Sequence, residues 1–208
     1  MLKFKSVLSV CLCSLLISTN TMATEEAEYT VLLKEENLEV RHYEPQIVAE
    51  TTVDTEFEDA GSEAFGRLFD YISGNNQSRQ EIAMTAPVGQ VAESQEIDMT
   101  APVGQTQVDG KWVVSFMMPG SFTMQTTPKP RDERITIRQV PERTMAAIQY
   151  SGFWSKSGYQ KNKARLEEWI DKKGFIIQGK PVWARYNAPF MPWFLRRNEV
   201  LIPINNLQ

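Results

Sequence analysis

Cysteine and histidine are almost absent from this chain of 208 residues. It contains two cysteines, Cys11 and Cys13, and a single histidine, His42. Both cysteines lie within the first 23 residues, so the remainder offers no thiol for a disulfide bond or for nucleophilic catalysis. A zinc site would lack its usual ligands, and the chain has no G-x-S-x-G motif. These absences argue against a nucleophilic enzyme and against a zinc protein.

A long apolar run is missing as well. Residues 1–23 hold two lysines, then an apolar run over residues 7–17, then polar residues ending at Ala23. That order is typical of a secretory signal peptide cleaved after Ala23, and the run is shorter than the roughly 20 residues that span a bilayer. A lipid anchor on a cysteine is the alternative, but bulky Val10 and Leu12 stand where lipoprotein processing needs a small residue. We therefore expect an exported periplasmic protein that is soluble after cleavage.

Basic residues are in the minority. Without residues 1–23, 20 basic residues face 26 acidic ones, a formal net charge of −6. Proteins that bind nucleic acid present a basic face, so we expect no nucleic-acid partner. The hydrophobic content of 42% is ordinary for a globular chain, and we expect a single domain over residues 24–208 that is a monomer.

Two long segments match each other at an offset of 97 residues. "LEVRHYEPQIVAETTV" over residues 38–53 alternates apolar and polar residues around Glu44-Pro45, which predicts a β-hairpin. "ITIRQVPERTMAAIQY" over residues 135–150 repeats this pattern. A helical spacing of apolar residues follows each segment and stops at Gly74 and at Gly174, with capping boxes predicted at Thr55 and Ser157.

These matches predict an α+β fold built from a duplicated unit. The two halves cover about residues 29–125 and 133–204. Each contributes strands and one helix, which gives a mixed sheet or a barrel with two helices packed outside.

A shorter repeat doubles eleven residues. "QEIAMTAPVGQ" at residues 80–90 returns as "QEIDMTAPVGQ" at residues 95–105. In a strand, Ile97, Met99, Ala101 and Val103 would share one face, and the single change within the motif, to Asp98, falls on the opposite face. We expect the apolar row to be buried and Asp98 to face water.

Four separated motifs resemble one known family. "RHYEP", "YISG", "IAMTAPV" and "RYNAPFMPWFLRRNEV" occur in this order, and over residues 29–204 the chain resembles the SOUL haem-binding protein family. The resemblance implies a distorted, mixed or antiparallel β-barrel with pseudo-twofold symmetry, flanked by two α-helices. It also implies that the doubled motif is a family feature, and that the chain binds haem or a related tetrapyrrole in a hydrophobic groove.

The segment at residues 187–198 is the first candidate wall of that groove. It crowds large apolar side chains in a loop that two prolines keep extended, and two arginines follow them directly. A tetrapyrrole is a flat apolar plate with two propionates at one edge, so aromatic rings can stack on it and guanidinium groups can pair with its carboxylates. The candidate ligand-binding residues here are Phe190, Met191, Trp193, Phe194, Arg196 and Arg197.

The resemblance places the opposing wall on the first helix. Phe65, Arg67, Leu68 and Phe69 would form it. The alternative is that Phe65, Leu68 and Phe69 belong to the stripe that the helix buries against the sheet.

His42 is the natural candidate for an axial haem-iron ligand, because it matches a histidine proposed for that role in some relatives. The alternative is a structural histidine on a strand. Met84 and Met99 are further candidates, since thioether sulfur can also ligate haem iron.

Carriage, storage or scavenging of haem is therefore the leading functional hypothesis. Two alternatives use other properties of the chain. It could modify or degrade haem, because the chemistry would belong to the cofactor. It could also dock on a membrane surface or on a protein through the aromatic residues 190–197.

Overall fold

The computed structural model describes residues 24–78 and 94–205. The predicted signal peptide, the first copy of the doubled motif and Met84 lie outside these ranges. The helices are α1 (Phe57–Ile72) and α2 (Lys156–Lys173), with a 3-10 turn, η1 (Trp193–Leu195). The strands are β1 (Glu25–Glu26), β2 (Tyr29–Glu35), β3 (Leu38–Tyr43), β4 (Gln46–Val53), β5 (Asn76–Gln77), β6 (Thr100–Ala101), β7 (Val103–Val108), β8 (Lys111–Met117), β9 (Lys129–Pro130), β10 (Ile135–Val140), β11 (Arg143–Tyr150), β12 (Val182–Arg185) and β13 (Asn198–Pro203).

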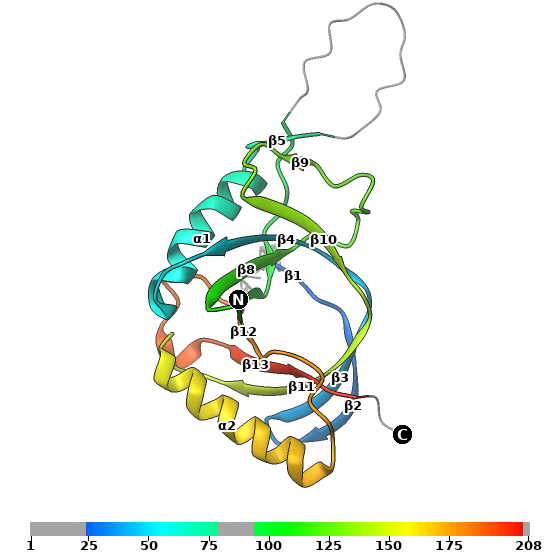
Figure 1. Ribbon diagram of the computed structural model, residues 1–208, viewed down its shortest axis with the longest axis vertical. Coiled ribbons are helices and arrows are strands. Elements are labelled where there is room, and N and C mark those ends of the chain that lie inside the picture. The colour runs from blue at the N-terminus through cyan, green and yellow to red at the C-terminus, as the bar shows by residue number, and fades with distance from the viewer. Residues whose placement is uncertain (1–23, 79–93, 206–208) are drawn as a thin grey trace, which may run out of the picture.

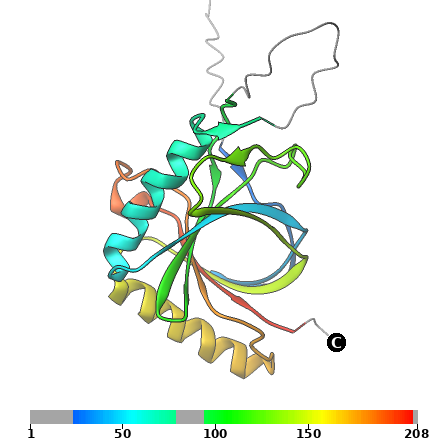
Figure 2. The same cartoon turned by 45° about the horizontal axis from the view of Figure 1, so that its top comes forward.

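Nine strands form one antiparallel sheet, in the order β10-β4-β8-β7-β12-β13-β11-β3-β2. The sheet curls into a partial barrel, and both helices lie on its outer side (Figure 1). The tilted view in Figure 2 shows the same curl. The predicted α+β class, with a barrel-like sheet and two flanking helices, is confirmed.

The two predicted β-hairpins are wrong, because the two arms of each, β3 with β4 and β10 with β11, do not pair with each other. β3 pairs with β2 and β11, whereas β4 pairs with β10 and β8. Two-residue hairpin loops favour left-handed backbone, which proline cannot adopt. The corners here are Glu44-Pro45 and Pro141-Glu142, and none of these four residues has a positive φ. The chain therefore stays extended at each corner, and its two arms diverge.

The arms pair instead between the two matching segments. Val40 of β3 lies opposite Ala146 of β11, and Ala49 of β4 lies opposite Ile137 of β10. Ala49 and Ala146 are 97 positions apart, as are Val40 and Ile137. The offset found in the sequence thus also relates the two strand pairs in the sheet.

Each helix buries one apolar face against the outside of the sheet. The buried residues of α1 are Phe57, Ala60, Gly61, Ala64, Leu68, Tyr71 and Ile72. Those of α2 are Tyr159, Asn162, Leu166, Trp169 and Ile170. The helical spacings predicted in the sequence produce these two faces.

Both predicted capping boxes need correction. Helix α1 begins after Glu56, whose side chain makes no capping bond. In α2 the cap is Ser155, whose hydroxyl accepts the Gly158 N–H, and not Ser157. Gly174 ends α2 with φ of 75°, the left-handed conformation in which glycine is favoured.

The inner side of the curl carries a buried charged network. Arg41 donates to Glu199 through both terminal nitrogens, at 2.7 and 3.1 Å, and to Glu39 through Nε at 2.7 Å. Arg41 and Glu199 are almost completely buried, which costs desolvation that these charge-assisted bonds offset. The network links β3 to β13, the strand that follows η1.

Candidate functional site

An apolar pocket of about 640 Å3 opens between α1 and the chain that leaves β12. Its lining residues are Thr24, Glu58, Gly61, Ser62, Phe65, Phe69, Met99, Thr100, Ala101, Val103, Trp154, Trp183, Arg185, Tyr186, Asn187, Ala188, Pro189 and Phe190. Small-molecule sites in proteins are roughly 300–1,000 Å3 in volume and mostly apolar, with a few polar groups that orient the ligand. The pocket matches this description.

Helix α1 supplies one aromatic wall. Phe65 and Phe69 are four residues apart, so they share a helix face, and their rings stack with centroids 5.8 Å apart. Phe65 also packs edge-on against Phe116 of β8. Phe69 is 46% exposed although it lies on a helix with a buried face. Apolar surface is therefore left uncovered at the pocket.

Tryptophans from two other segments complete the aromatic lining. Trp183 projects from β12 and stacks on Phe57, with centroids 4.8 Å apart. Trp154 lies in the turn before α2, where its indole N–H donates to Asn198 Oδ1 at 2.9 Å. Both tryptophans are thus held in place by contacts outside the pocket.

Among the described residues that line the pocket, Arg185 is the one arginine or lysine. Its guanidinium carbon lies 4.9 Å from the ring centre of Trp183 and 5.3 Å from that of Trp154. The terminal nitrogens lie so close to α1 that a Cβ on Gly61 would come within 2.6 Å of each. Arg185 forms no ion pair with a described carboxylate, and its Nε is buried without a hydrogen-bond partner. Burial lowers the pKa of Arg185 to about 10.

Four residues of the predicted site line this pocket or stand directly behind it. Phe65 and Phe69 line it on α1, and Phe190, which is 88% exposed, lines it at the mouth. Arg196 stands one layer behind, because its guanidinium carbon lies 4.4 Å from the ring centre of Trp154. Its Nε and Nη2 donate to the carbonyls of Met191 and Pro189, which fixes the loop.

Arg197 and Arg67 have their guanidinium groups engaged elsewhere. Arg197 pairs with Glu199 at 3.0 Å and with Glu26 at 2.8 Å, and it lies over the ring of Tyr186. The Arg67 side chain donates to the Thr51 hydroxyl at 2.5 Å and to Glu63 at 3.3 Å. Neither lines the pocket. Leu68 is fully buried in the hydrophobic core against which α1 packs, as the alternative interpretation of that helix expected.

The remaining loop residues form a separate exposed surface. Trp193 stacks on Phe153 with centroids 5.1 Å apart, and Phe194 packs edge-on against Trp193. We call Phe153, Trp193, Phe194 and Leu195 the outer aromatic patch; they are between 48% and 64% exposed. Met191 is half-buried beside the patch. None of these residues lines the pocket.

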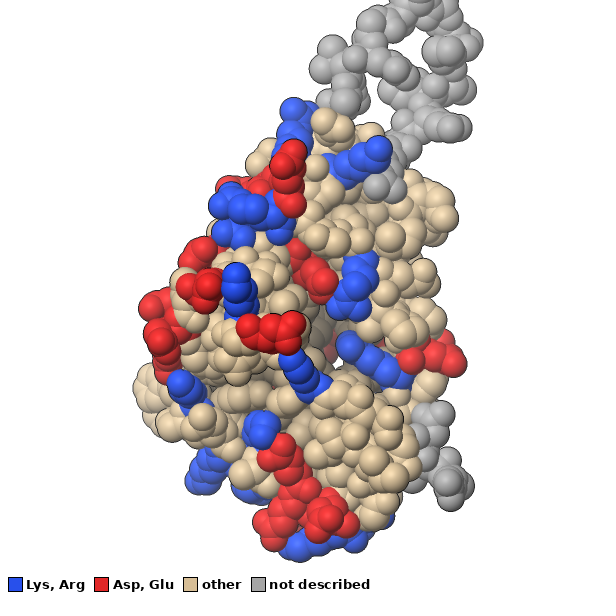
Figure 3. All heavy atoms as spheres, in the orientation of Figure 1, with Lys and Arg blue, Asp and Glu red and all other residues tan. Residues whose placement is uncertain are grey.

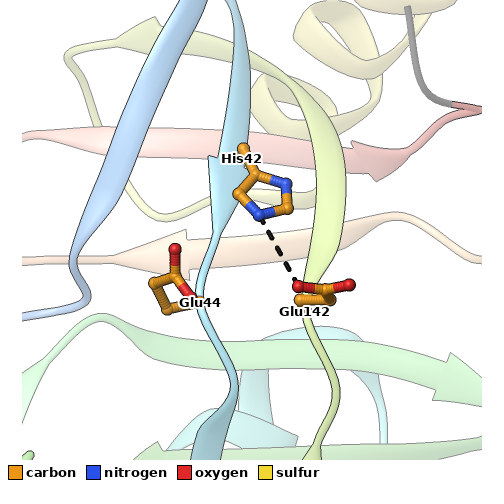
Figure 4. A group of neighbouring side chains, drawn as sticks. All are labelled: His42, Glu44 and Glu142. Carbon is orange, nitrogen blue, oxygen red and sulfur yellow. Dashed lines mark ion pairs between the residues drawn. The ribbon is translucent and has the colours of Figure 1, made fainter.

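His42 lies far along the sheet from the pocket. It is on β3, and β13 and β11 separate that strand from β12. Its Nε2 is 3.9 Å from a Glu142 carboxylate oxygen, and Glu44 completes a group of three that could hold a metal ion (Figure 4). The two glutamates of this group are exposed and no second feature there points to a ligand. Within the part of the chain that the structure describes, Met99 is the one thioether in the lining, and no histidine lines the pocket.

A second cavity, of about 620 Å3, has the opposite charge. It is lined by Glu25, Glu26, Glu28 and Glu44 together with methionines, and by no lysine or arginine. Carboxylates there would repel a ligand that carries carboxylates. The apolar pocket with Arg185 is therefore the better candidate for a tetrapyrrole.

Sequence reasoning missed Gly61, Trp154, Trp183 and Arg185. One signal was available: Trp183 and Arg185 are two positions apart on β12, so they share a face of the strand. Trp154 and Gly61 come from segments that only the fold brings to that face.

Acidic and basic side chains are interspersed over the face of the molecule seen in Figure 3. Within residues 24–78 and 94–205, no helix is both long enough and apolar enough to cross a membrane.

Comparison with known proteins gives a consistent result. The family model described as SOUL heme-binding protein matches residues 24–203. Heme-binding protein 2 of Mus musculus is 25% identical over 170 residues, covering 77% of this chain and 78% of its own. Heme-binding protein 1 of Xenopus tropicalis is 27% identical over 169 residues, covering 81% of this chain and 84% of its own. The crystal structure of the EcmrR C-terminal domain covers 86% of this chain and 99% of its own, with a TM-score of 0.59; at 9% identity it supports the fold alone.

Proposed function

Because this chain belongs to the SOUL heme-binding protein family, we propose that it binds haem or a related tetrapyrrole non-covalently in the pocket beside α1. One observation carries the assignment to this pocket. Aromatic side chains from α1, β12 and the turn before α2 line a single cavity of about 640 Å3, and Phe69 and Phe190 remain exposed at it. Flat apolar ligands bind to such walls by stacking and by removal of apolar surface from water.

The pocket holds a tetrapyrrole mainly by packing. Phe65 and Phe69 offer one flat wall, and Trp154 and Trp183 offer further aromatic surface. Haem brings its own iron, and among the described lining residues the thioether of Met99 could ligate it. The hydroxyl of Tyr186, also in the lining, donates instead to Glu199 at 2.8 Å. His42 lies outside the lining. We therefore expect haem binding to survive the removal of His42.

The biological role that we propose is carriage, storage or scavenging of haem in the periplasm by a soluble monomer. The leader-like pattern of residues 1–23 supports export. The acidic charge balance supports a small-molecule partner and not a nucleic acid.

Haem titration with matched variants tests this function. The purified protein should give a saturable change in Soret absorbance at one equivalent of haem. Phe69→Ser removes a pocket wall and should weaken binding by about tenfold, since burial of an aromatic side chain contributes roughly 1.5–3 kcal/mol. Phe153→Ser makes the same change on the outer aromatic patch and is the control. Binding that does not saturate, or equal loss in both variants, would contradict the assignment.

The outer aromatic patch supports a second function, docking on a membrane surface. Four large apolar side chains lie together and exposed, and Trp193 is of the type that favours a membrane–water interface. We expect the protein to co-sediment with lipid vesicles without ligand, and Phe194→Ser with Leu195→Ser to abolish this. If the wild type stays in the supernatant, this function is lost and the haem site is unaffected.

A further inference from the structure

Arg185 carries a positive charge into the apolar pocket with almost none of its donors satisfied. A guanidinium group has five N–H donors and no acceptor. The Nε of Arg185 is buried without a hydrogen-bond partner. Its Nη2 donates one long hydrogen bond, to Gln105 Oε1 at 3.4 Å. No carboxylate among the described residues forms an ion pair with it. A carboxylate, which has two acceptor oxygens, would match these donors in fork geometry.

Three other arginines in this part of the molecule have acceptors for their guanidinium groups. Arg41 is bound in fork geometry by Glu199, and Arg197 is bound by Glu199 and Glu26. Arg196 donates to two backbone carbonyls. Arg185 differs from all three in that it opens into a cavity large enough for a ligand.

We propose that Arg185 binds a carboxylate of the ligand, so that the pocket selects flat apolar molecules that carry an acidic group at one edge. This inference rests on the proposed function and extends it to ligand specificity. It replaces Arg196 and Arg197, which the sequence suggested for this role.

The surroundings of Arg185 hold it in place for that purpose. Gly61 leaves room for the terminal nitrogens against α1, and the two tryptophan rings lie beside the guanidinium group. Burial lowers the pKa of Arg185, so the folded protein bears a cost for keeping the charge there. A ligand carboxylate would remove that cost, because a charged hydrogen-bonded pair is favoured where water is excluded.

Glu58 is the one acidic residue that lines the same pocket. Its carboxylate accepts the Lys156 N–H at 3.3 Å and forms no ion pair with Arg185. A negative charge at this position repels a second carboxylate of the ligand. Glu58→Gln removes this repulsion and should therefore strengthen haem binding.

The test compares haem with haem dimethyl ester, which has the same macrocycle and iron but no carboxylate. Both are titrated in the same co-solvent into the wild type, Arg185→Met and Arg185→Lys, with Arg138→Met as a control of the same chemistry at a distant ion pair. The wild type should prefer haem by about 10- to 100-fold, the range that a hydrogen-bonded charge pair contributes. Arg185→Met should bind both ligands equally, Arg185→Lys should keep part of the preference, and Arg138→Met should match the wild type.

Stability without ligand separates a binding role from a structural one. Arg185→Met should unfold at the same or a higher urea concentration than the wild type, because the change removes an unpaired buried charge. Equal affinity of the wild type for both ligands would overturn the inference and leave haem binding standing. A less stable Arg185→Met that loses both ligands equally would also overturn it. If neither ligand binds the wild type, the proposed function fails, and the inference fails with it.

Discussion

Arg185 of β12 and Gly61 of α1 are in direct contact, and the contact depends on the missing side chain of the glycine. A Cβ at position 61 would come within 2.6 Å of both terminal guanidinium nitrogens. The guanidinium end of Arg185 can lie against α1 here because residue 61 has no side chain. Gly61 thus leaves the space that the guanidinium group of Arg185 occupies.

Gly61→Ala should therefore impair the pocket more than the fold. The new methyl group would push the flexible end of Arg185 into the cavity, so haem affinity should fall by about tenfold or more, as for loss of a charged hydrogen bond. The gain in helix propensity, up to about 1 kcal/mol, should offset part of the overpacking. Gly66→Ala on the same helix is the control, since its Cβ would meet nothing within 4 Å. If both variants bind haem like the wild type, the contact has no bearing on the ligand.

Glu199→Gln should destabilise the protein strongly. Glu199 is fully buried between Arg41 and Arg197, and removing its charge leaves two guanidinium groups without that counter-ion. The expected loss is about 3–5 kcal/mol in the free energy of unfolding, measured by urea denaturation. Glu50→Gln breaks the more exposed pair with Arg138 and should cost at most about 1 kcal/mol. Similar losses in the two variants would show that the buried network contributes no more than a surface pair.

Glu35 should make stability depend on pH in the acid range. Lys173 and Trp169 of α2 donate hydrogen bonds to Glu35 of β2 and so link the helix to the strand. These bonds lower the pKa of Glu35 below its ordinary value of 4.5. A carboxyl whose pKa is lower in the folded state stabilises the protein fully above the unfolded pKa, and this contribution is lost as the pH falls through the folded pKa. The difference in unfolding free energy between the wild type and Glu35→Gln should therefore shrink from pH 7 to pH 3. A difference that stays constant over this range would contradict the assigned bonds.

Ser155→Ala should cost about 1 kcal/mol of stability. Its hydroxyl accepts the Gly158 N–H at the start of α2, and loss of such a cap typically has this effect. Ser157→Ala is the matched control and should change the unfolding free energy by a few tenths of a kcal/mol at most, because Ser157 is exposed and is not the cap. The reverse ranking would restore the capping box that the sequence suggested.

The local sequence pattern was sufficient to predict the two helices and the burial of most of the apolar row in the second copy of the doubled motif. The helical spacing in the sequence gives the buried faces of α1 and α2, and Gly174 marks the end of α2. In the second copy of the doubled motif, Ile97, Ala101 and Val103 are buried and Asp98 is exposed, as predicted. The strict alternation was wrong for Met99, which is half-buried, and for Thr100, which is buried on the face of Asp98, and the strand there begins only at Thr100. These properties depend on residues a few positions apart, which is the range over which backbone geometry alone orders side chains.

Strand pairing and the choice of arginine could not be predicted in this way. The corners at Pro45 and Pro141 look like hairpin turns in the sequence, yet each arm pairs with a strand about 100 residues away. Arg197 looked free for a ligand until the fold brought Glu26 to it from the other end of the chain. Arg185 could not be chosen from the sequence, because its significance is that no carboxylate among the described residues forms an ion pair with it.

By itself, the sequence determined the two helices, the 97-residue offset between matching strands and the family to which the chain belongs. Only the tertiary structure decided which side chains face a common cavity and which charges remain unpaired there. The physical reason is that helix faces follow from contacts between near neighbours, whereas the satisfaction of a buried charge depends on every group that folding brings around it.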